Sequence, residues 1–208
     1  MKHQKQTAVM KVKEIFYSIQ GEGGRQGEAS IFIRLSKCNL NCWFCDTDWN
    51  TGVEMSIEAI ASEIKQYNCK WIIWTGGEPT MQLTEDILSY FKDLGYKQAI
   101  ETNGTNKVSK LIDYITCSPK KEVSLKKLHD NFPNGVNEFR FPISDDVKIP
   151  TIKSLPYADN YFVSPIFTGE EKKRFELNEQ NINKCIDFVL KNTDWKLSLQ
   201  IHKILNIR

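Results

Sequence analysis

The sequence lacks long apolar runs and a strong excess of charge of either sign. No segment approaches the 18 or so consecutive apolar residues of a membrane-spanning helix, and the first residues, MKHQKQTAVMKVKEIF, lack the apolar core of a signal peptide. Lysine plus arginine (28) nearly balance aspartate plus glutamate (26), so the overall charge is not that of a typical nucleic-acid-binding protein. We therefore expect a cytoplasmic protein that binds neither a membrane nor nucleic acid.

Internal repeats, low-complexity tracts and linkers long enough to separate domains are also missing. A chain of 208 residues can bury about 70% of its unfolded surface, which is enough for a stable core without disulfides. We expect one domain over residues 1–208.

Cysteine occurs six times, but no fourth cysteine accompanies the three that gather in one place. Cys38, Cys42 and Cys45 lie in the loop 36–49, within the stretch CNLNCWFC, which directly follows a predicted strand. The other cysteines each stand beside apolar residues and are predicted to be small buried side chains: Cys69, Cys117 and Cys185.

The cysteine cluster has several possible functions. Structural zinc normally takes four ligands, a disulfide would leave one thiol over, and a thioredoxin-like Cys42–Cys45 pair would leave Cys38 unexplained. An iron–sulfur cluster with four irons and three cysteines keeps one iron open for a ligand, and we favour this interpretation. The alternative is a zinc module that binds nucleic acid through a lysine run, but that run is typical of a solvated helix face: Lys120, Lys121, Lys126 and Lys127.

Strands and helices alternate along the chain. Ser56 and Thr84 are predicted to cap the starts of two helices. A short helix is expected near 107–112 and a longer one around 182–190, and the segment 195–201 closes the chain. Apolar runs predict strands at 12–19, 30–35, 70–75, 98–102, 114–118, 137–143 and 161–167. About six strands with helical crossovers imply an α/β fold with a mainly parallel sheet, either open or part of a barrel. Ligands of such sheets bind at the carboxyl ends of the strands, where the glycine-rich and polar segments of this sequence fall.

The spacing C-x3-C-x2-C, followed about thirty residues later by Thr75-Gly76-Gly77-Glu78-Pro79, resembles the radical S-adenosylmethionine (SAM) superfamily. The resemblance covers nearly the whole chain for one family, the 7-carboxy-7-deazaguanine synthases of queuosine and 7-deazapurine biosynthesis. The matching segments are EIFYSIQGEG (14–23), FIRLSKCNLNCWFCDT (32–47), TGGEP (75–79), ETNGT (101–105), CSPK (117–120) and WKLSLQIHKILNIR (195–208).

The resemblance implies a trimmed partial (β/α) barrel of about six mainly parallel strands. It also implies a [4Fe-4S] cluster on Cys38, Cys42 and Cys45 whose open iron binds SAM, and a Mg²⁺ ion on Thr47. The implied reaction converts 6-carboxy-5,6,7,8-tetrahydropterin to 7-carboxy-7-deazaguanine by radical ring contraction with loss of ammonia. Electrons would come from a donor such as flavodoxin or ferredoxin, and a homodimer is common in the family.

The resemblance also implies roles for individual residues. Glu22 belongs with the cysteines as a catalytic residue. Substrate contacts are expected from Ile19, Gln20, Gly21, Glu22, Arg34, Thr75, His202 and the terminal carboxylate of Arg208. Cofactor contacts are expected from Gly76, Gly77, Glu78, Ser118, Pro119, Lys120, Ser164 and Pro165.

The chain departs from the family pattern at three places near the expected pocket. Ser164-Pro165 stands where Gln-Pro is usual, Gln200-Ile201-His202-Lys203 where Gln-Thr-His-Lys is usual, and Glu138-Phe139-Arg140-Phe141 where Glu-Leu-Lys-Val is common. These changes leave the residues of the radical chemistry in place, but they leave open which substrate the pocket binds. Two alternative functions therefore stay open, a queuine lyase of queuosine salvage and a glycyl-radical activase.

Overall fold

The computed structural model describes residues 8–45, 47–143, 148–167 and 178–208. Together these residues form one sheet of nine strands in the order β3-β1-β2-β4-β5-β6-β7-β8-β9. β1 is antiparallel to both of its neighbours, and every other neighbouring pair is parallel. The strands are β1 (Val9–Ile19), β2 (Ala29–Leu35), β3 (Val53–Ser56), β4 (Trp71–Gly76), β5 (Lys97–Thr102), β6 (Tyr114–Cys117), β7 (Val136–Ile143), β8 (Ala158–Pro165) and β9 (Lys196–Leu197).

The predicted α/β class and the largely parallel sheet are confirmed. The predicted count of about six strands is too low, mainly because the two edge strands are short: β3 has four residues and β9 has two. Such short strands give almost no alternating pattern to detect in a sequence. Within the described residues β3 and β9 do not pair with each other, so the sheet is open, as in a partial barrel.

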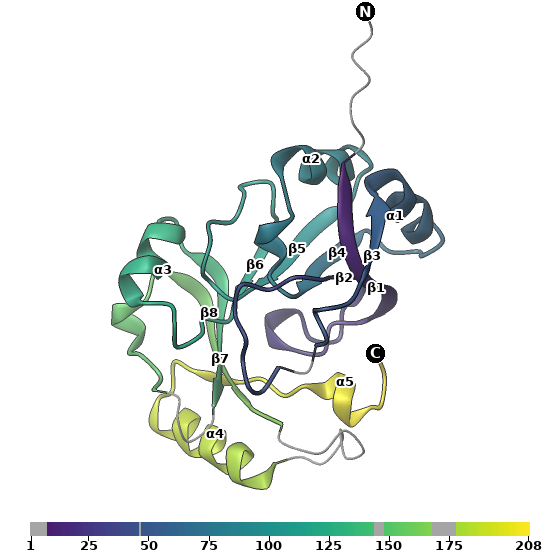
Figure 1. Cartoon of the computed structure of the whole chain (residues 1–208). Helices are drawn as coiled ribbons and strands as arrows, with labels where there is room; N and C mark the ends of the chain where they lie inside the picture. The colour runs from purple at the N-terminus through teal and green to yellow at the C-terminus, as the bar shows by residue number, and fades with distance from the viewer. Residues whose placement is uncertain (1–7, 46, 144–147, 168–177) are drawn as a thin grey trace, which may run out of the picture.

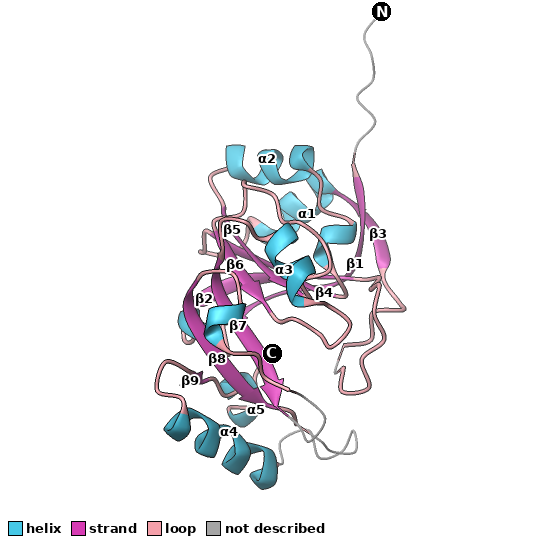
Figure 2. Cartoon of the chain, turned by 90° about the vertical axis from the view of Figure 1, so that its left-hand side faces the viewer, coloured by secondary structure: helices cyan, strands magenta, loops and turns pink. Residues whose placement is uncertain are grey.

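Helices α1 to α4 lie along the outside of the sheet, whereas α5, near the C-terminus, packs against the turn after β1 (Figures 1 and 2). α1 and α2 pack near β1, β3 and β5, and α4 packs on β7, β8 and β9 at the other end of the molecule. The helices are α1 (Ile57–Ile64), α2 (Glu85–Asp93), α3 (Leu125–Asn131), α4 (Glu179–Lys191) and α5 (Ile201–Ile204), with short 3₁₀ turns at Gly23–Arg25, Pro79–Met81 and Ile152–Ser154. In the described ranges no helix is long and apolar enough to cross a membrane.

The helix starts follow from capping side chains. The hydroxyl of Ser56 accepts a hydrogen bond from Ala59 N (3.2 Å), and that of Thr84 accepts from Ile87 N (3.4 Å), so both predicted N-caps are confirmed.

The predicted solvated helix face holds for Lys126 and Lys127, which are exposed on α3. It is wrong for Lys120, which lies on the loop before α3, is half-buried and faces a cavity.

One local prediction is wrong. The segment 107–112 forms turns instead of a helix, because polar side chains there bond to nearby backbone: Thr105 N donates to Asn103 Oδ1 (2.9 Å) and Leu111 N to Ser109 Oγ (3.1 Å). The closing segment 195–201 contains the short strand β9 at Lys196–Leu197 and leads into α5.

The core has two large clusters, one on each half of the sheet. The first packs α1 and α2 against β1, β2, β4 and β5, and the second packs α3 and α4 against β6, β7 and β8. Val108 and Ile115 contact both clusters. Cys117 and Cys185 are fully buried in the second cluster, as predicted, whereas Cys69 is half-buried.

Candidate active site

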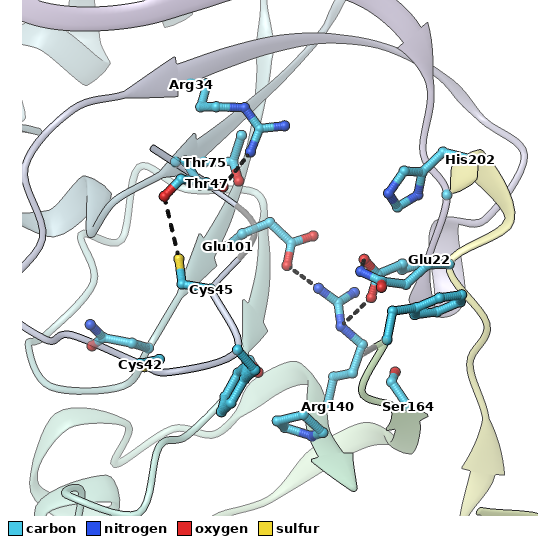
Figure 3. Close-up of a pocket in the computed structure, with 18 of the residues that line it drawn as sticks. Glu22, Arg34, Cys42, Cys45, Thr47, Thr75, Glu101, Arg140, Ser164 and His202 are labelled. Atoms are coloured by element: carbon cyan, nitrogen blue, oxygen red, sulfur yellow. Dashed lines mark hydrogen bonds and ion pairs between the residues drawn. The ribbon is translucent and has the colours of Figure 1, made fainter. Parts of the chain in front are cut away.

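A cavity of about 300 Å³ lies at the carboxyl ends of the strands (Figure 3). Segments that follow β2, β4, β5, β6 and β8 contribute to its wall, since parallel strands bring their carboxyl ends to the same edge of the sheet, and the segment after the antiparallel β1 contributes as well. Every site residue predicted from the sequence lines this cavity except Glu78 and Pro119. The sequence patterns therefore located much of the wall, but not lining residues such as Glu101, Arg140 and Gln200.

The three clustered cysteines lie at one end of the cavity. In the described structure none of the three is in a disulfide, Cys38 and Cys42 are half-buried and Cys45 is exposed, and Cys45 N donates to Cys42 O at 3.1 Å. Burial raises the pKa of the Cys42 thiol, and the nearby Lys120 ammonium opposes that rise.

The residues present suit an iron–sulfur cluster by donor type and by place. Three soft thiol donors on one loop line one wall, which is the ligand chemistry that iron–sulfur clusters use. In the described ranges no three Cys, His, Asp or Glu side chains already converge as a metal-ion site. The loop therefore supplies the ligands, and their sulfurs would have to turn toward one another on binding.

Gly76 and Gly77 hold the start of the cysteine loop. A Cβ atom at Gly77 would lie 1.8 Å from Lys37 O, and one at Gly76, where φ is +109°, would lie 2.2 Å from Leu35 O. The close approach allows Gly77 N to donate to Leu35 O and Glu78 N to donate to Lys37 O, both at 2.9 Å. These glycines were expected to let a ligand approach the backbone, but their tightest contacts are with the chain that leads to Cys38.

Glu78 lies behind the cavity wall. The side chain is fully buried, and its carboxylate accepts hydrogen bonds from Thr80 Oγ1 (2.6 Å), Thr102 Oγ1 (2.9 Å) and Asn103 N (2.7 Å). Glu78 thus joins the ends of β4 and β5. Its predicted cofactor contact, like that of the buried Pro119, has no counterpart in the cavity lining and stays a prediction.

The cavity floor carries a cluster of three carboxylates around one guanidinium. Arg140 on β7 pairs with Glu101 (2.5 Å), Glu22 (3.1 Å) and, more distantly, Glu138 (3.6 Å). Figure 3 shows Arg140 between Glu22 and Glu101. Sequence reasoning did not assign Glu101 or Arg140 to the site. Two sequence features could have pointed to these residues: Glu101 belongs to ETNGT at the end of a strand, and Arg140 stands where the family commonly has lysine.

Burial controls the protonation of this cluster. It raises the pKa of Glu101 to about 7, with further contributions from Glu138 and Glu22, while Arg140 acts in the opposite direction. The three carboxylates raise the pKa of Arg140, which stays charged. With all groups ionised, the floor carries more negative than positive charge and favours N–H donors on a ligand.

Two donors near this floor have no hydrogen-bond partner among the described residues. They are Arg140 Nη1 and the hydroxyl of Ser164, which is only 6% exposed. Both side chains line the cavity. A buried polar group without a partner is costly, so these atoms suit a ligand that accepts hydrogen bonds.

Arg34 on β2 faces the cavity from another side. Its Nε donates to Glu14 Oε1 and its Nη1 to Thr47 Oγ1, both at 2.9 Å. Figure 3 shows Arg34 beside Thr47 and Thr75. Thr75 is the β4 residue paired with Arg34. Asp48 turns away to Lys13 (2.7 Å), which lowers the pKa of Asp48 to about 2, so among the described residues of this stretch Thr47 is the oxygen donor that lines the cavity. Asp46 lies outside the described residues.

His202 and Lys120 complete two further walls. Ile201 N donates to Gly21 O (3.0 Å), and a Cβ at Gly21 would lie 2.1 Å from His202 Nδ1, so glycine is needed where the imidazole packs. Lys120 donates to Ser118 Oγ (2.8 Å) on the cysteine side, and burial lowers the pKa of this lysine.

Comparisons with known proteins agree with this arrangement. The profile of the Radical SAM superfamily matches residues 32–131. The 7-carboxy-7-deazaguanine synthase of Bacteroides thetaiotaomicron is 35% identical over 204 residues, covering 95% of this chain and 98% of that protein. The enzyme of the same name from Haemophilus influenzae is 37% identical over 208 residues, covering 94% and 93%.

A solved structure shares the fold. The crystal structure of QueE from Escherichia coli superposes with a TM-score of 0.69 and covers 92% of this chain and 93% of that chain. Sequence identity is 22%, so this likeness establishes the architecture.

Proposed function

The chain belongs to the 7-carboxy-7-deazaguanine synthase family of radical SAM enzymes, and we propose that it converts 6-carboxy-5,6,7,8-tetrahydropterin to 7-carboxy-7-deazaguanine. One observation carries the proposal: a single cavity is lined by three cysteine thiols at one end and, facing them, by carboxylates and a guanidinium suited to a pterin that bears a carboxylate. When bound, the iron–sulfur cluster and SAM supply the electron and the radical that start the ring contraction.

The cysteine end of the cavity is proposed to hold the cofactors. Cys38, Cys42 and Cys45 ligate the cluster. Lys120, next to Cys42 and hydrogen-bonded to Ser118, places a positive charge where the carboxylate of SAM binds. Gly76, Gly77 and Pro165 form the adjacent part of the cavity wall. The hydroxyl of Ser164, which has no hydrogen-bond partner among the described residues, donates to the cofactor.

The rest of the cavity, from Thr47 beside the cysteine loop to the cluster around Arg140, is proposed to hold the substrate. Arg34 pairs with the substrate carboxylate, and Thr47 with Mg²⁺ orients the same group, since a hard cation prefers oxygen ligands. Glu22, whose position is fixed by Arg140 and by Gln200 Nε2 (2.8 Å), accepts from the guanidine-like N–H edge of the ring. Ile19, Gln20, Gly21, Thr75, His202 and Arg208 enclose the ring.

The lyase and activase alternatives are not favoured. Curated relatives that match nearly the whole chain carry the synthase name. A cavity of about 300 Å³ also suits a small molecule better than a protein segment.

The remaining expectations are part of the same proposal. Six cysteines, none of them in a disulfide in the described structure, suit a reducing cytoplasm, and a small electron-transfer protein such as flavodoxin or ferredoxin would reduce the cluster. A homodimer and a single domain over 1–208 are proposed on the family resemblance.

Anaerobic reconstitution with iron and sulfide tests the proposal. The reconstituted protein, given SAM, reductant and 6-carboxytetrahydropterin, should form a product with the mass of 7-carboxy-7-deazaguanine, while queuine should remain uncleaved. Cys42→Ala should lose the visible iron–sulfur absorption and 5′-deoxyadenosine formation, whereas Cys69→Ala, a cysteine outside the cavity, should keep both. Stoichiometric zinc without iron–sulfur absorption would contradict the proposal.

The metal assignment has its own test. Thr47→Ala should weaken the Mg²⁺ dependence of turnover and leave iron content unchanged. An unchanged Mg²⁺ dependence would refute the role of Thr47.

A further inference from the structure

Glu14 on β1 lies behind the predicted substrate residues and outside the cavity lining, yet it contacts two residues that line it. One carboxylate oxygen accepts from Arg34 Nε at 2.9 Å, and the other pairs with Arg208 Nη1 at 3.1 Å. Glu14 therefore connects β2 with segment 201–208, which are far apart in the sequence.

Two further residues of β1, on the same face as Glu14, also contact Arg208. Glu14, Phe16 and Ser18 point to the same face of β1, because side chains alternate along a strand. The Phe16 ring lies beneath both guanidinium groups, 5.6 Å from Arg34 Cζ and 6.0 Å from Arg208 Cζ, and Ser18 Oγ donates to Arg208 O. Three successive residues on one face of β1 thus hold segment 201–208.

The same carboxylate fixes the orientation of Arg34. Glu14 is directly opposite Arg34 in the β1–β2 pair, and Arg34 Nη1 donates to Thr47 at 2.9 Å. A guanidinium held at two of its nitrogens presents its other N–H groups in a fixed plane, which is what a paired contact with a carboxylate requires.

We propose that Glu14 is a positioning residue that orients Arg34 for the substrate carboxylate and, through Arg208, keeps segment 201–208 over the pocket. This inference rests on the proposed function for its substrate. Its structural part, the attachment of segment 201–208 to β1, holds whatever the substrate is. The segment carries His202 and Lys203, both in the cavity wall, so its attachment determines whether that wall is present.

Limited proteolysis tests the structural part without substrate or cofactor. In Glu14→Gln, trypsin should cleave after Lys203 about fivefold faster than in the wild type, as expected for the loss of an ion pair. Arg208→Gln should have the same effect, and the double variant should be cleaved no faster than Glu14→Gln alone. The matched control is Asp130→Asn, which removes the ion pair with Lys126 (2.8 Å) on α3 and should leave this cleavage unchanged. Equal cleavage of Glu14→Gln and Asp130→Asn would overturn the attachment.

Steady-state kinetics on the reconstituted enzyme tests the orienting part. Glu14→Gln should raise KM for 6-carboxytetrahydropterin about tenfold and keep kcat within about twofold, since the lost contact serves binding. Arg208→Gln should raise KM less, because Arg34 keeps its partner. Equal KM values for Glu14→Gln and the wild type would overturn the orienting role. A wild-type enzyme that forms no deazaguanine product would refute the proposed function instead, and the proteolysis result would still decide the attachment.

Discussion

Buried ionisable and polar side chains decide much of the behaviour of this site at the scale of single residues. Three carboxylates from β5, β7 and the turn after β1 meet around Arg140, and two cavity donors, Arg140 Nη1 and Ser164 Oγ, have no hydrogen-bond partner in the part of the chain that the structure describes. Both features favour the binding of a ligand and lower the stability of the ligand-free protein, as is common at functional sites.

Glu101 should make stability dependent on pH. Its pKa is raised from 4.5 to about 7 by burial, so the folded state binds more protons than the unfolded state between these values. The stabilisation is fully present below pH 4.5 and is lost as the pH rises through 7, a difference of about 3 kcal/mol. Urea unfolding of the wild type and of Glu101→Gln at several pH values measures it. The free energy of unfolding should fall more steeply with pH in the wild type, and parallel curves would contradict the assignment.

Ser164→Ala should stabilise the ligand-free protein by about 1 kcal/mol, because it removes a buried hydroxyl that has no partner. SAM affinity should fall in the same variant. The control is Ser198→Ala: Ser198 is 1% exposed and accepts from Gly23 N at 2.8 Å, so its loss should destabilise by about 1 kcal/mol. Thermal unfolding and SAM titration measure both effects. Destabilisation by Ser164→Ala would mean that its hydroxyl does have a partner in the ligand-free protein.

At the scale of elements, the junctions between strands and loops organise the site. The end of β4 contacts the loop after β2 through Gly76 and Gly77, and Glu78 joins the ends of β4 and β5. The motif TGGEP therefore acts largely as a joint between neighbouring strands.

Gly77→Ala should displace the cysteine loop, because the new Cβ would lie 1.8 Å from Lys37 O. We expect a folded protein whose iron content after reconstitution is strongly reduced. Gly95→Ala is the matched control: its φ is +81° and nothing lies within 4 Å, so it carries only the backbone strain of about 1 to 2 kcal/mol. Iron analysis together with circular dichroism distinguishes the two, and full iron loading of Gly77→Ala would show that the loop accommodates the methyl group.

Several elements could be predicted because their signals are local. Ser56 and Thr84 cap the helices they precede, and the apolar runs of β2, β4 and β5 are strands. The helix expected at 107–112 is wrong for a reason that is also local: the Ser109 hydroxyl accepts from Leu111 N and competes with helical hydrogen bonding.

At the scale of the whole molecule, the two core clusters should unfold together. They share one continuous sheet and the contacts of Val108 and Ile115. Thermal unfolding of the ligand-free protein should therefore give one transition, with the same midpoint by tryptophan fluorescence and by far-ultraviolet circular dichroism. Two separate midpoints would contradict the prediction of a single domain.

The sequence by itself determined the chemistry of the cofactor end. The cysteine spacing, the glycines at 76 and 77 and the polar residues at strand ends are local patterns, and a parallel sheet brings strand ends to one edge whatever its detailed curvature. Only the tertiary structure decided which of these side chains reach the cavity. Glu78 turns behind the wall, and Glu101, Arg140 and Glu22 meet because three strands separated by many residues curve around one space. Residues so far apart in the sequence give no periodic pattern that would reveal their pairing. The ion pairs of Arg140 with Glu22 and Glu101 can therefore be identified only in the folded structure.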